Sequence, residues 1–368
     1  MCPTVRERKA IKSSLAAVLA AAISALSALG CSNGHGVEAE NGWSESRIDS
    51  LVAAMPDLLA RHAIPGVAIA LTHGPHVQWS SGFGVASRNG EPVSSSTIFQ
   101  AASLGKPLFA ELVSSLALER SWALEDAVES WAPAGSYRAE LASVTAAALL
   151  SHTAGLVYDP VADQVTLNSQ LRGQWQYSGA GYSFLQRMIE ASDGQGLETL
   201  ASARWFRPLG LQTMSFLSPA SGSIAEGHDR KGRPVQGMEW KDASAASSLY
   251  TSAHDYARFL INAAGVGAAA EPGRLQTVTP QVAVREDLGL FWGFGWAMER
   301  DPAGGFTAFH WGSNPGFKSF ALVDRTREIG LVILTNGDNG LELAEDVLSI
   351  IDPRSHPLFK FYMLHPDD

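Results

Sequence analysis

The spacing of hydrophobic residues in the first part of the chain predicts a helix followed by a hairpin. The helix begins after Ser44 or Ser46, and its apolar positions recur three and four residues apart, which gives one buried face. That face consists of Ile48, Leu51, Val52, Met55, Leu58 and Leu59. Two β-like runs follow at residues 66–72 and 77–85, and the turn at residues 73–76 between them predicts a hairpin.

The remainder of the chain changes from a helical pattern to a strand pattern. From residue 103 to about residue 260 the pattern is mainly helical, with glycine and proline breaks, and helices are expected at residues 143–150 and after a cap at residues 251–255. Strands are expected at residues 291–298, 306–311, 319–323 and 329–336, before a last helix at about 341–351. Strands at both chain ends predict the α+β class: an α/β lobe on one antiparallel sheet, with an inserted helical lobe. A seam between two lobes is a usual place for an active site.

Composition and charge narrow the class of protein. The 368 residues can bury a large core, as one elaborate domain or as two lobes. The contents of 46% apolar and 17% charged residues are globular values. The formal net charge of −10 argues against nucleic acid as a partner.

The first thirty residues have the pattern of an export signal. Arg6, Arg8, Lys9 and Lys12 form a basic region, and the apolar, alanine-rich residues 13–29 follow. Residues 1–30 are therefore expected to be a signal peptide. Their removal takes away four basic groups and one acidic group, so the net charge would fall from −10 to −13.

Cys31 follows the apolar segment directly. Residues 28–31 (ALGC) resemble a bacterial lipobox, which predicts lipid attachment at Cys31, and simple secretion is the alternative. The other cysteine, Cys2, lies in the segment expected to be removed, so no disulfide is expected. Residues 31–43 are interpreted as a tether and residues 44–368 as the folded domain. This predicts an exported, periplasmic or cell-envelope protein that contacts the membrane through its N-terminal lipid anchor only.

Ser103 and Lys106 are the strongest candidates for chemistry. They lie where a strand-like run gives way to a helix-like run, and their spacing places both on one face of a helix. The amine is then within reach of the hydroxyl as a base, and the helix N-terminus adds positive potential, as an acyl-transfer serine requires. However, chance supplies nearly one S-x-x-K in a chain with seven lysines. A helix-capping serine beside an exposed lysine is therefore the alternative.

Five further motifs accompany this one. They are residues 149–156 (LLSHTAGL), 177–182 (YSGAGY), 207–211 (RPLGL), 248–255 (SLYTSAHD) and 310–317 (HWGSNPGF). Together with residues 102–107 (ASLGKP), and in this order, they resemble the β-lactamase-related serine hydrolase family of class C β-lactamases, D-alanyl-D-alanine carboxypeptidases and family VIII-like esterases. The resemblance implies a β-lactamase/transpeptidase-like fold, an antiparallel sheet flanked by helices with a helical lobe, which agrees with the pattern of elements.

The resemblance implies catalytic roles for three side chains. Ser103 corresponds to the nucleophile, Lys106 to its activating amine, and Tyr177 to the tyrosine of the family's Y-x-N motif. A serine hydroxyl is a poor nucleophile at neutral pH and needs a base beside it. That base is either Lys106, desolvated between the lobes, or Tyr177 as a phenolate stabilised by Lys106, and the sequence leaves the choice open.

A second set of expected site residues lies on one C-terminal strand. His310, Trp311 and Gly312 take the place of the family's K-T-G motif, which is H-x-G in esterases and some peptidases, and are expected to contact substrate. By the same analogy, the backbone N–H groups of Ser103 and Ser313 are the expected oxyanion donors.

Other histidine and aromatic residues are interpreted as structural. Tyr182 is expected to pack in the core, His152 to end a helix, and His73 and His76 to lie in a solvated turn. Five aromatic residues are expected to be mostly core, with one or two lining an apolar acyl pocket: Trp292, Phe294, Trp296, Trp311 and Phe317. No metal or organic cofactor is predicted, because the histidines are scattered and no phosphate-binding glycine loop is visible.

Three departures from the family pattern concern substrate recognition. Gly179 replaces the usual Asn, His310 replaces Lys and Trp311 replaces Thr, so an amide, a fixed positive charge and a hydroxyl are missing. The sequence therefore predicts an exported serine hydrolase that forms an acyl-enzyme on Ser103 and takes small-molecule esters, amides or peptides. The alternatives are a penicillin-binding D-alanyl-D-alanine carboxypeptidase or weak class C-like β-lactamase, and a non-catalytic binding lipoprotein.

Overall fold

The computed structural model describes residues 42–159, 164–263, 277–302 and 304–364. The chain divides into two units, residues 1–40 and 41–368, and the described residues belong to the second. The expected signal peptide and Cys31 lie outside the described residues. No helix in the described ranges combines the length and the apolar character needed to cross a membrane.

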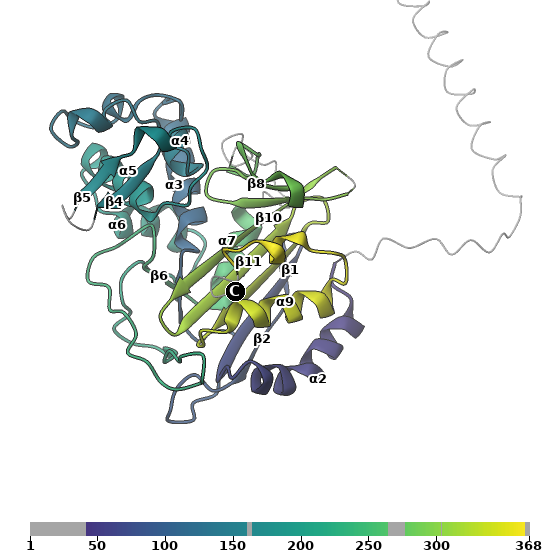
Figure 1. Cartoon of the computed structure of the whole chain (residues 1–368). Coiled ribbons are helices and arrows are strands. Elements are labelled where there is room, and N and C mark those ends of the chain that lie inside the picture. The colour runs from purple at the N-terminus through teal and green to yellow at the C-terminus, as the bar shows by residue number, and fades with distance from the viewer. Residues whose placement is uncertain (1–41, 160–163, 264–276, 303, 365–368) are drawn as a thin grey trace, which may run out of the picture. The chain divides into compact units, whose positions relative to one another are not determined.

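The core of the folded unit is one eight-stranded antiparallel sheet, with the order β2-β1-β12-β11-β10-β9-β8-β7 (Figure 1). Its strands are β1 (Gly66–His73), β2 (His76–Gly84), β7 (Val282–Arg285), β8 (Leu290–Trp292), β9 (Ala297–Arg300), β10 (Phe306–Asn314), β11 (Phe317–Asp324) and β12 (Ile329–Thr335). Strand β1 pairs with β12 along its length, from Val67 opposite Thr335 to His73 opposite Ile329. The expectation of one sheet built from both parts of the chain is therefore confirmed.

The single strand expected at residues 291–298 is instead two short strands, β8 and β9. The turn between them contains Gly293 and Gly295. Gly295 has a φ of +81°, and a Cβ at this position would lie 2.6 Å from the Cβ of Ala110. The large apolar residues around these glycines have the pattern of one continuous strand. In the structure the turn at Gly295 interrupts that strand.

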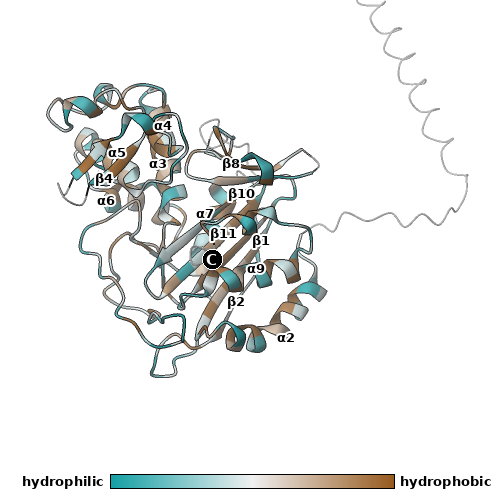
Figure 2. Cartoon of the chain, in the orientation of Figure 1, coloured by the Kyte–Doolittle hydropathy of each residue, from teal (hydrophilic) through white to brown (hydrophobic). Residues whose placement is uncertain are grey.

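Helices cover both faces of the sheet (Figure 1). Helices α2 (Glu45–Arg61) and α9 (Gly340–Ile351) pack on one face, and α7 (Ala253–Ala263) packs on the other. Because both faces are covered, every residue of β12 is buried, and the central strands are mostly hydrophobic (Figure 2). Val52 was expected on the buried face of α2 but is 42% exposed, because it lies at the margin of the apolar stripe.

The second lobe is inserted between two short strands, β3 (Phe99–Ala102) and β6 (Leu249–Thr251), which pair with each other. Its elements are α3 (Gly105–Glu119), α4 (Ala146–Leu150), β4 (Leu156–Asp159), β5 (Gln164–Leu167), α5 (Gly179–Asp193) and α6 (Leu197–Ala201). Its short helical turns are η1 (Val128–Ser130), η2 (Ala139–Leu141), η3 (Ser169–Leu171) and η4 (Ser202–Phe206). Two further turns, η5 (Glu286–Leu288) and η6 (Pro357–Lys360), come after this lobe in the chain. Residues 207–248 form turns and isolated bridges instead of the expected helical structure, because glycine, proline and serine interrupt them.

Leu331 and Leu118 offer a matched test of this core. Leu331 is fully buried at the centre of β12, whereas Leu118 on α3 is 53% exposed. We expect Leu331→Ala to lower the free energy of unfolding by about 2–5 kcal/mol, because it leaves a cavity. Leu118→Ala should change it by about 0.5 kcal/mol or less. Urea denaturation followed by tryptophan fluorescence measures both, and equal losses would contradict this packing.

Candidate active site

Ser103 lies in the turn that joins β3 to α3. The helix begins at Gly105, so Ser103 stands just before it rather than in its first turn as expected. The turn still brings the two side chains together: the Nζ of Lys106 lies 2.8 Å from the Oγ of Ser103. Ala102, which precedes the serine, has a φ of +51°, a strained conformation of the kind that clusters at functional sites.

Lys106 is buried, with 1% of its surface exposed. Its amine donates a hydrogen bond to the carbonyl oxygen of Ala246 at 2.6 Å, and the Ser103 hydroxyl donates to the same oxygen at 3.1 Å. Burial disfavours the charged ammonium form and lowers the pKa of Lys106 to about 7. A substantial fraction of the amine is therefore neutral at physiological pH, with a lone pair that can accept the serine proton.

Tyr177 precedes α5 and covers the amine from the side of the helical lobe. The Nζ of Lys106 lies 4.8 Å from the centre of the Tyr177 ring. Burial raises the pKa of Tyr177 above its ordinary value, although the nearby Ser103 hydroxyl opposes the rise. The Tyr177 hydroxyl has no hydrogen bond of standard geometry to any described residue. The phenol therefore stays protonated at neutral pH.

His152 holds the chain on both sides of Tyr177. Its carbonyl accepts from the N–H of Gln176 at 2.9 Å, and its ring Nδ1 accepts from the N–H of Ser178 at 3.1 Å. The ring also packs on Tyr177, with 4.6 Å between centroids. The sequence predicts only that His152 ends a helix, because no local pattern indicates that it orients the tyrosine. Burial holds its pKa well below the ordinary value, so the ring is neutral.

Strand β10 brings the second set of expected residues to the same seam. It pairs with β9 only from Phe306 to Phe309, so its remaining residues, His310–Asn314, have a free edge on that side. Gly312 lies against β3, where a Cβ would collide with the carbonyl oxygen of Ala101. A glycine is therefore required for β10 to approach the turn that carries Ser103. Ser313 follows it and is exposed.

His310 is fully buried and neutral. Its Nδ1 lies 2.7 Å from the carbonyl oxygen of Trp311, so this nitrogen carries the proton. Burial, reinforced by the nearby Lys106, lowers the pKa of His310 to about 3. The position of the family's K-T-G lysine consequently carries no positive charge in this protein.

Trp311 packs between the helical lobe and the C-terminal segment. Its ring stacks on Tyr177 at 5.6 Å and also contacts Phe361, which comes from the C-terminal segment, at 5.7 Å. No sequence motif marked Phe361, because the contact joins residues fifty positions apart. All five aromatic residues expected near the strand are at most 4% exposed and belong to the core, so none of them lines an open acyl pocket.

The structure also bears on three other features considered from the sequence, namely Gly179, Tyr182 and a possible metal site. A Cβ built on Gly179 would lie 3.7 Å from the Cβ of Ala246, which is an ordinary van der Waals distance. Tyr182 is buried, and its hydroxyl donates to the carbonyl oxygen of Leu150. Within the described ranges, no group of three or more His, Cys, Asp or Glu side chains could hold a metal ion.

Fold and site together define a class, a hydrolase with a serine–lysine pair in the seam between an antiparallel sheet and a helical lobe. The model of the Beta-lactamase family matches residues 48–351, and the chain belongs to this family. It is 28% identical to esterase EstB of Burkholderia gladioli, over 76% of this chain and 87% of the esterase. It is 27% identical to penicillin-binding protein 4 of Amycolatopsis lactamdurans, over 76% of this chain and 83% of that protein.

Solved structures agree on the fold. A β-lactamase/D-alanine carboxypeptidase from Pseudomonas syringae superposes with a TM-score of 0.71 at 21% identity, over 85% of this chain and all of that one. The expected β-lactamase/transpeptidase-like fold is thus confirmed, and the protein is a β-lactamase-family serine hydrolase related to esterases and penicillin-binding proteins.

The protonation state of His310 can be measured directly. Because its pKa is lowered to about 3, we expect its ring to keep the neutral Nδ1–H form from about pH 5 to about pH 8. Long-range ¹H–¹⁵N NMR spectra would show this form, with His310→Gln used to assign the signals. A ring that gains a proton within that range would contradict the neutral site.

Proposed function

We propose that the protein hydrolyses esters or small amides through an acyl-enzyme on Ser103, with Lys106 as the general base. The observation that supports this most is the 2.8 Å approach of a buried amine to the Ser103 hydroxyl. The two shifts in pKa favour the amine over the phenol as the base. The pKa of Lys106 falls to about 7, whereas the pKa of Tyr177 rises above its ordinary value.

In the acylation step, neutral Lys106 takes the proton as the Oγ of Ser103 attacks the substrate carbonyl carbon. The N–H groups of Ser103 and Ser313 are proposed to stabilise the resulting oxyanion. The carbon–oxygen bond to the leaving alcohol then breaks, and the alcohol receives its proton from Lys106. Water, deprotonated by the same amine, releases the acid and restores the Ser103 hydroxyl.

Esters are favoured because groups that would recognise a carboxylate next to the reacting carbonyl are replaced. His310 is neutral and Trp311 packs against Tyr177. Gly179 separately lacks the amide that would contact a substrate side-chain amide. A relative named as an esterase agrees with this choice. The second candidate, a penicillin-binding peptidase or weak β-lactamase, is supported by the relative named penicillin-binding protein 4. Export and a lipid anchor at Cys31 are proposed from the sequence pattern.

Short-chain 4-nitrophenyl esters test the proposed activity. We expect the protein to hydrolyse 4-nitrophenyl butyrate, and Ser103→Ala to lower kcat/KM by a factor of about 10³ or more, because the nucleophile is lost. Ser115 is half-buried on α3 and lies outside the predicted catalytic residues, so Ser115→Ala is a matched control. Turnover that persists in Ser103→Ala would refute the assignment. Covalent labelling of Ser103 by a fluorescent penicillin, with no ester turnover, would favour the second candidate.

The pH dependence of ester hydrolysis distinguishes the two bases. Lys106 acts only after losing its proton, so kcat/KM should rise with pH through about 7 and then level off. Below that pH the rate should fall about tenfold per unit, because the protonated fraction grows. Lys106→Met should remove most of the activity together with this limb. A limb that appears only at strongly alkaline pH would indicate Tyr177 as the base instead.

A further inference from the structure

The C-terminal segment, residues 353–364, follows α9 and passes in front of the sheet (yellow in Figure 1). Phe361 of this segment is 1% exposed, and its ring lies 5.7 Å from that of Trp311. Trp311 stacks on Tyr177 at 5.6 Å, and the Nζ of Lys106 lies 4.8 Å from the centre of the same tyrosine ring. A series of direct contacts therefore joins Phe361 to the Lys106 amine.

Phe361 lies between this aromatic cluster and solvent. The next residue, Tyr362, contacts the ring of Phe361 at 5.0 Å and is 57% exposed. Phe361 also packs on Trp175, a half-buried residue of the helical lobe, at 5.8 Å. Farther along the segment, Leu364 is buried and lines a cavity of about 280 Å³ together with Ser313. On this side of the active site, water is therefore one residue away from the buried rings.

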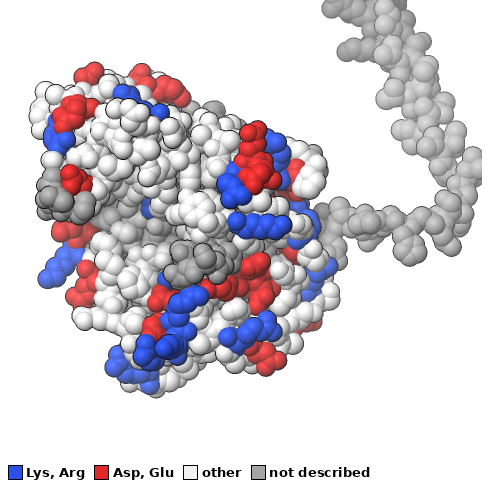
Figure 3. All heavy atoms as spheres, in the orientation of Figure 1, with Lys and Arg blue, Asp and Glu red and all other residues white. Residues whose placement is uncertain are grey.

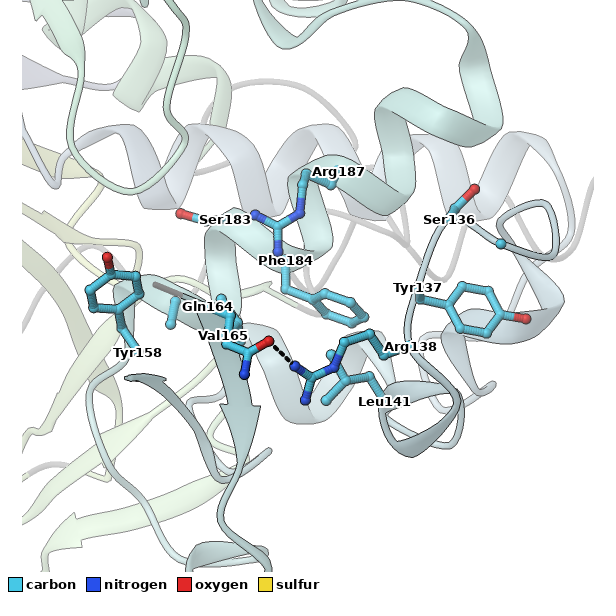
Figure 4. Close-up of a pocket in the computed structure, with 12 residues that line it drawn as sticks. Ser136, Tyr137, Arg138, Leu141, Tyr158, Gln164, Val165, Ser183, Phe184 and Arg187 are labelled. Atoms are coloured by element: carbon cyan, nitrogen blue, oxygen red, sulfur yellow. Dashed lines mark hydrogen bonds between the residues drawn. The ribbon is translucent and has the colours of Figure 1, made fainter. Parts of the chain in front are cut away.

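On the side of the helical lobe, a larger cavity stops short of the seam. It has a volume of about 720 Å³ and is bounded by α5, the β4–β5 hairpin and residues 135–141 (Figure 4). Phe184 of α5 contributes to its lining, whereas Ser103, Lys106 and Tyr177 are not among the described residues that line it. The contacts of the C-terminal segment are therefore the ones that bear on access of water to the amine.

Charged and polar contacts hold the C-terminal segment three to seven residues before Phe361. Arg354 donates a hydrogen bond to Asp352 at 2.8 Å, and the N–H of Leu358 donates to Glu299 at 2.7 Å. Acidic and basic side chains are interspersed on the face shown in Figure 3, and exposed pairs contribute little to stability. The Asp352 side chain is buried, so loss of Arg354 would leave a poorly compensated charge there.

We propose that the C-terminal segment keeps water away from Lys106, with Phe361 as the positioning residue that covers the aromatic cluster and Arg354 as the residue that holds the segment in place. Its effect on the reaction rests on the proposed role of Lys106 as general base. Burial favours the neutral amine, so entry of water would favour the ammonium form.

The titratable groups that face the amine come from other parts of the chain. They are His152, Tyr177 and Tyr182 from the helical lobe and His310 from β10. A change at Phe361 leaves all four side chains in the protein. Its effect on Lys106 would therefore arise from hydration and not from the loss of a neighbouring charge.

Phe361 and Phe359 offer a matched test. Both are buried in the same segment, but Phe359 packs on Phe320, at 5.5 Å, instead of on Trp311. We expect Phe361→Ala to raise the midpoint of the pH profile of kcat/KM for 4-nitrophenyl butyrate by about one unit or more. At pH 7 the rate then falls about fivefold, whereas the alkaline plateau changes less than about threefold. Phe359→Ala should leave the midpoint unchanged, and a purely structural loss would lower the rate equally at every pH.

Further variants separate the seal from its anchor. Phe361→Leu should restore the midpoint, because leucine again fills the space with an apolar side chain. Arg354→Met leaves Phe361 in place and should raise the midpoint by about half a unit or more, because the segment loosens. Arg88→Met removes an exposed pair with Glu226 and is the control that should not shift it.

The protonation of Lys106 can also be followed without turnover. Carbon-13 NMR of protein labelled at the lysine Cε atoms reports its titration, with Lys106→Met used to assign the signal. A raised midpoint in Phe361→Ala supports the proposal even if the protein hydrolyses no ester. Equal NMR midpoints in Phe361→Ala and Phe359→Ala would overturn it, whatever the ester kinetics show. Should Phe361→Ala fail to fold, equal midpoints in Arg354→Met and Arg88→Met would overturn it in the same way.

Discussion

The exclusion of water from the seam between the lobes is the constraint on which the site depends. Burial disfavours the charged form of any ionisable group, so it lowers the pKa of an amine or imidazole and raises that of a phenol. It acts in this way on Lys106, His152, His310 and Tyr177 at once. One physical cause therefore favours the neutral form of four neighbouring groups. In that state the amine beside Ser103 can act as a base instead of as a fixed cation.

This dry seam is assembled from segments that are distant in the sequence. Trp311 comes from β10, Tyr177 from the helical lobe and Phe361 from the C-terminal segment, and their rings contact one another around Trp311. Gly312 permits the close approach of β10 to β3. The carbonyl of Ala246 then satisfies the buried amine without adding a negative charge, which would have raised the pKa of Lys106 again.

The features predictable from the sequence were those carried by a local pattern. The spacing of Ser103 and Lys106 fits within one turn, so it predicted their contact. The alternating runs predicted β1 and β12, although not the turn at Gly295, which depends on the neighbouring Ala110. Contacts between distant segments have no local signal. The position of Phe361, and the two hydrogen bonds by which His152 holds the chain around Tyr177, could therefore be found only in the folded protein.

The altered residues at the edge of the sheet change which parts of a substrate the protein can contact. A cation next to the reacting carbonyl would act on a substrate carboxylate close to the bond that breaks. Without it, discrimination must come from parts of the substrate farther away, and such remote contacts can still accelerate the reaction when they position the reacting carbonyl. The loss of an amide at position 179 and the loss of a charge at position 310 thus have a common consequence. Both remove a polar contact that the family pattern offers to a substrate.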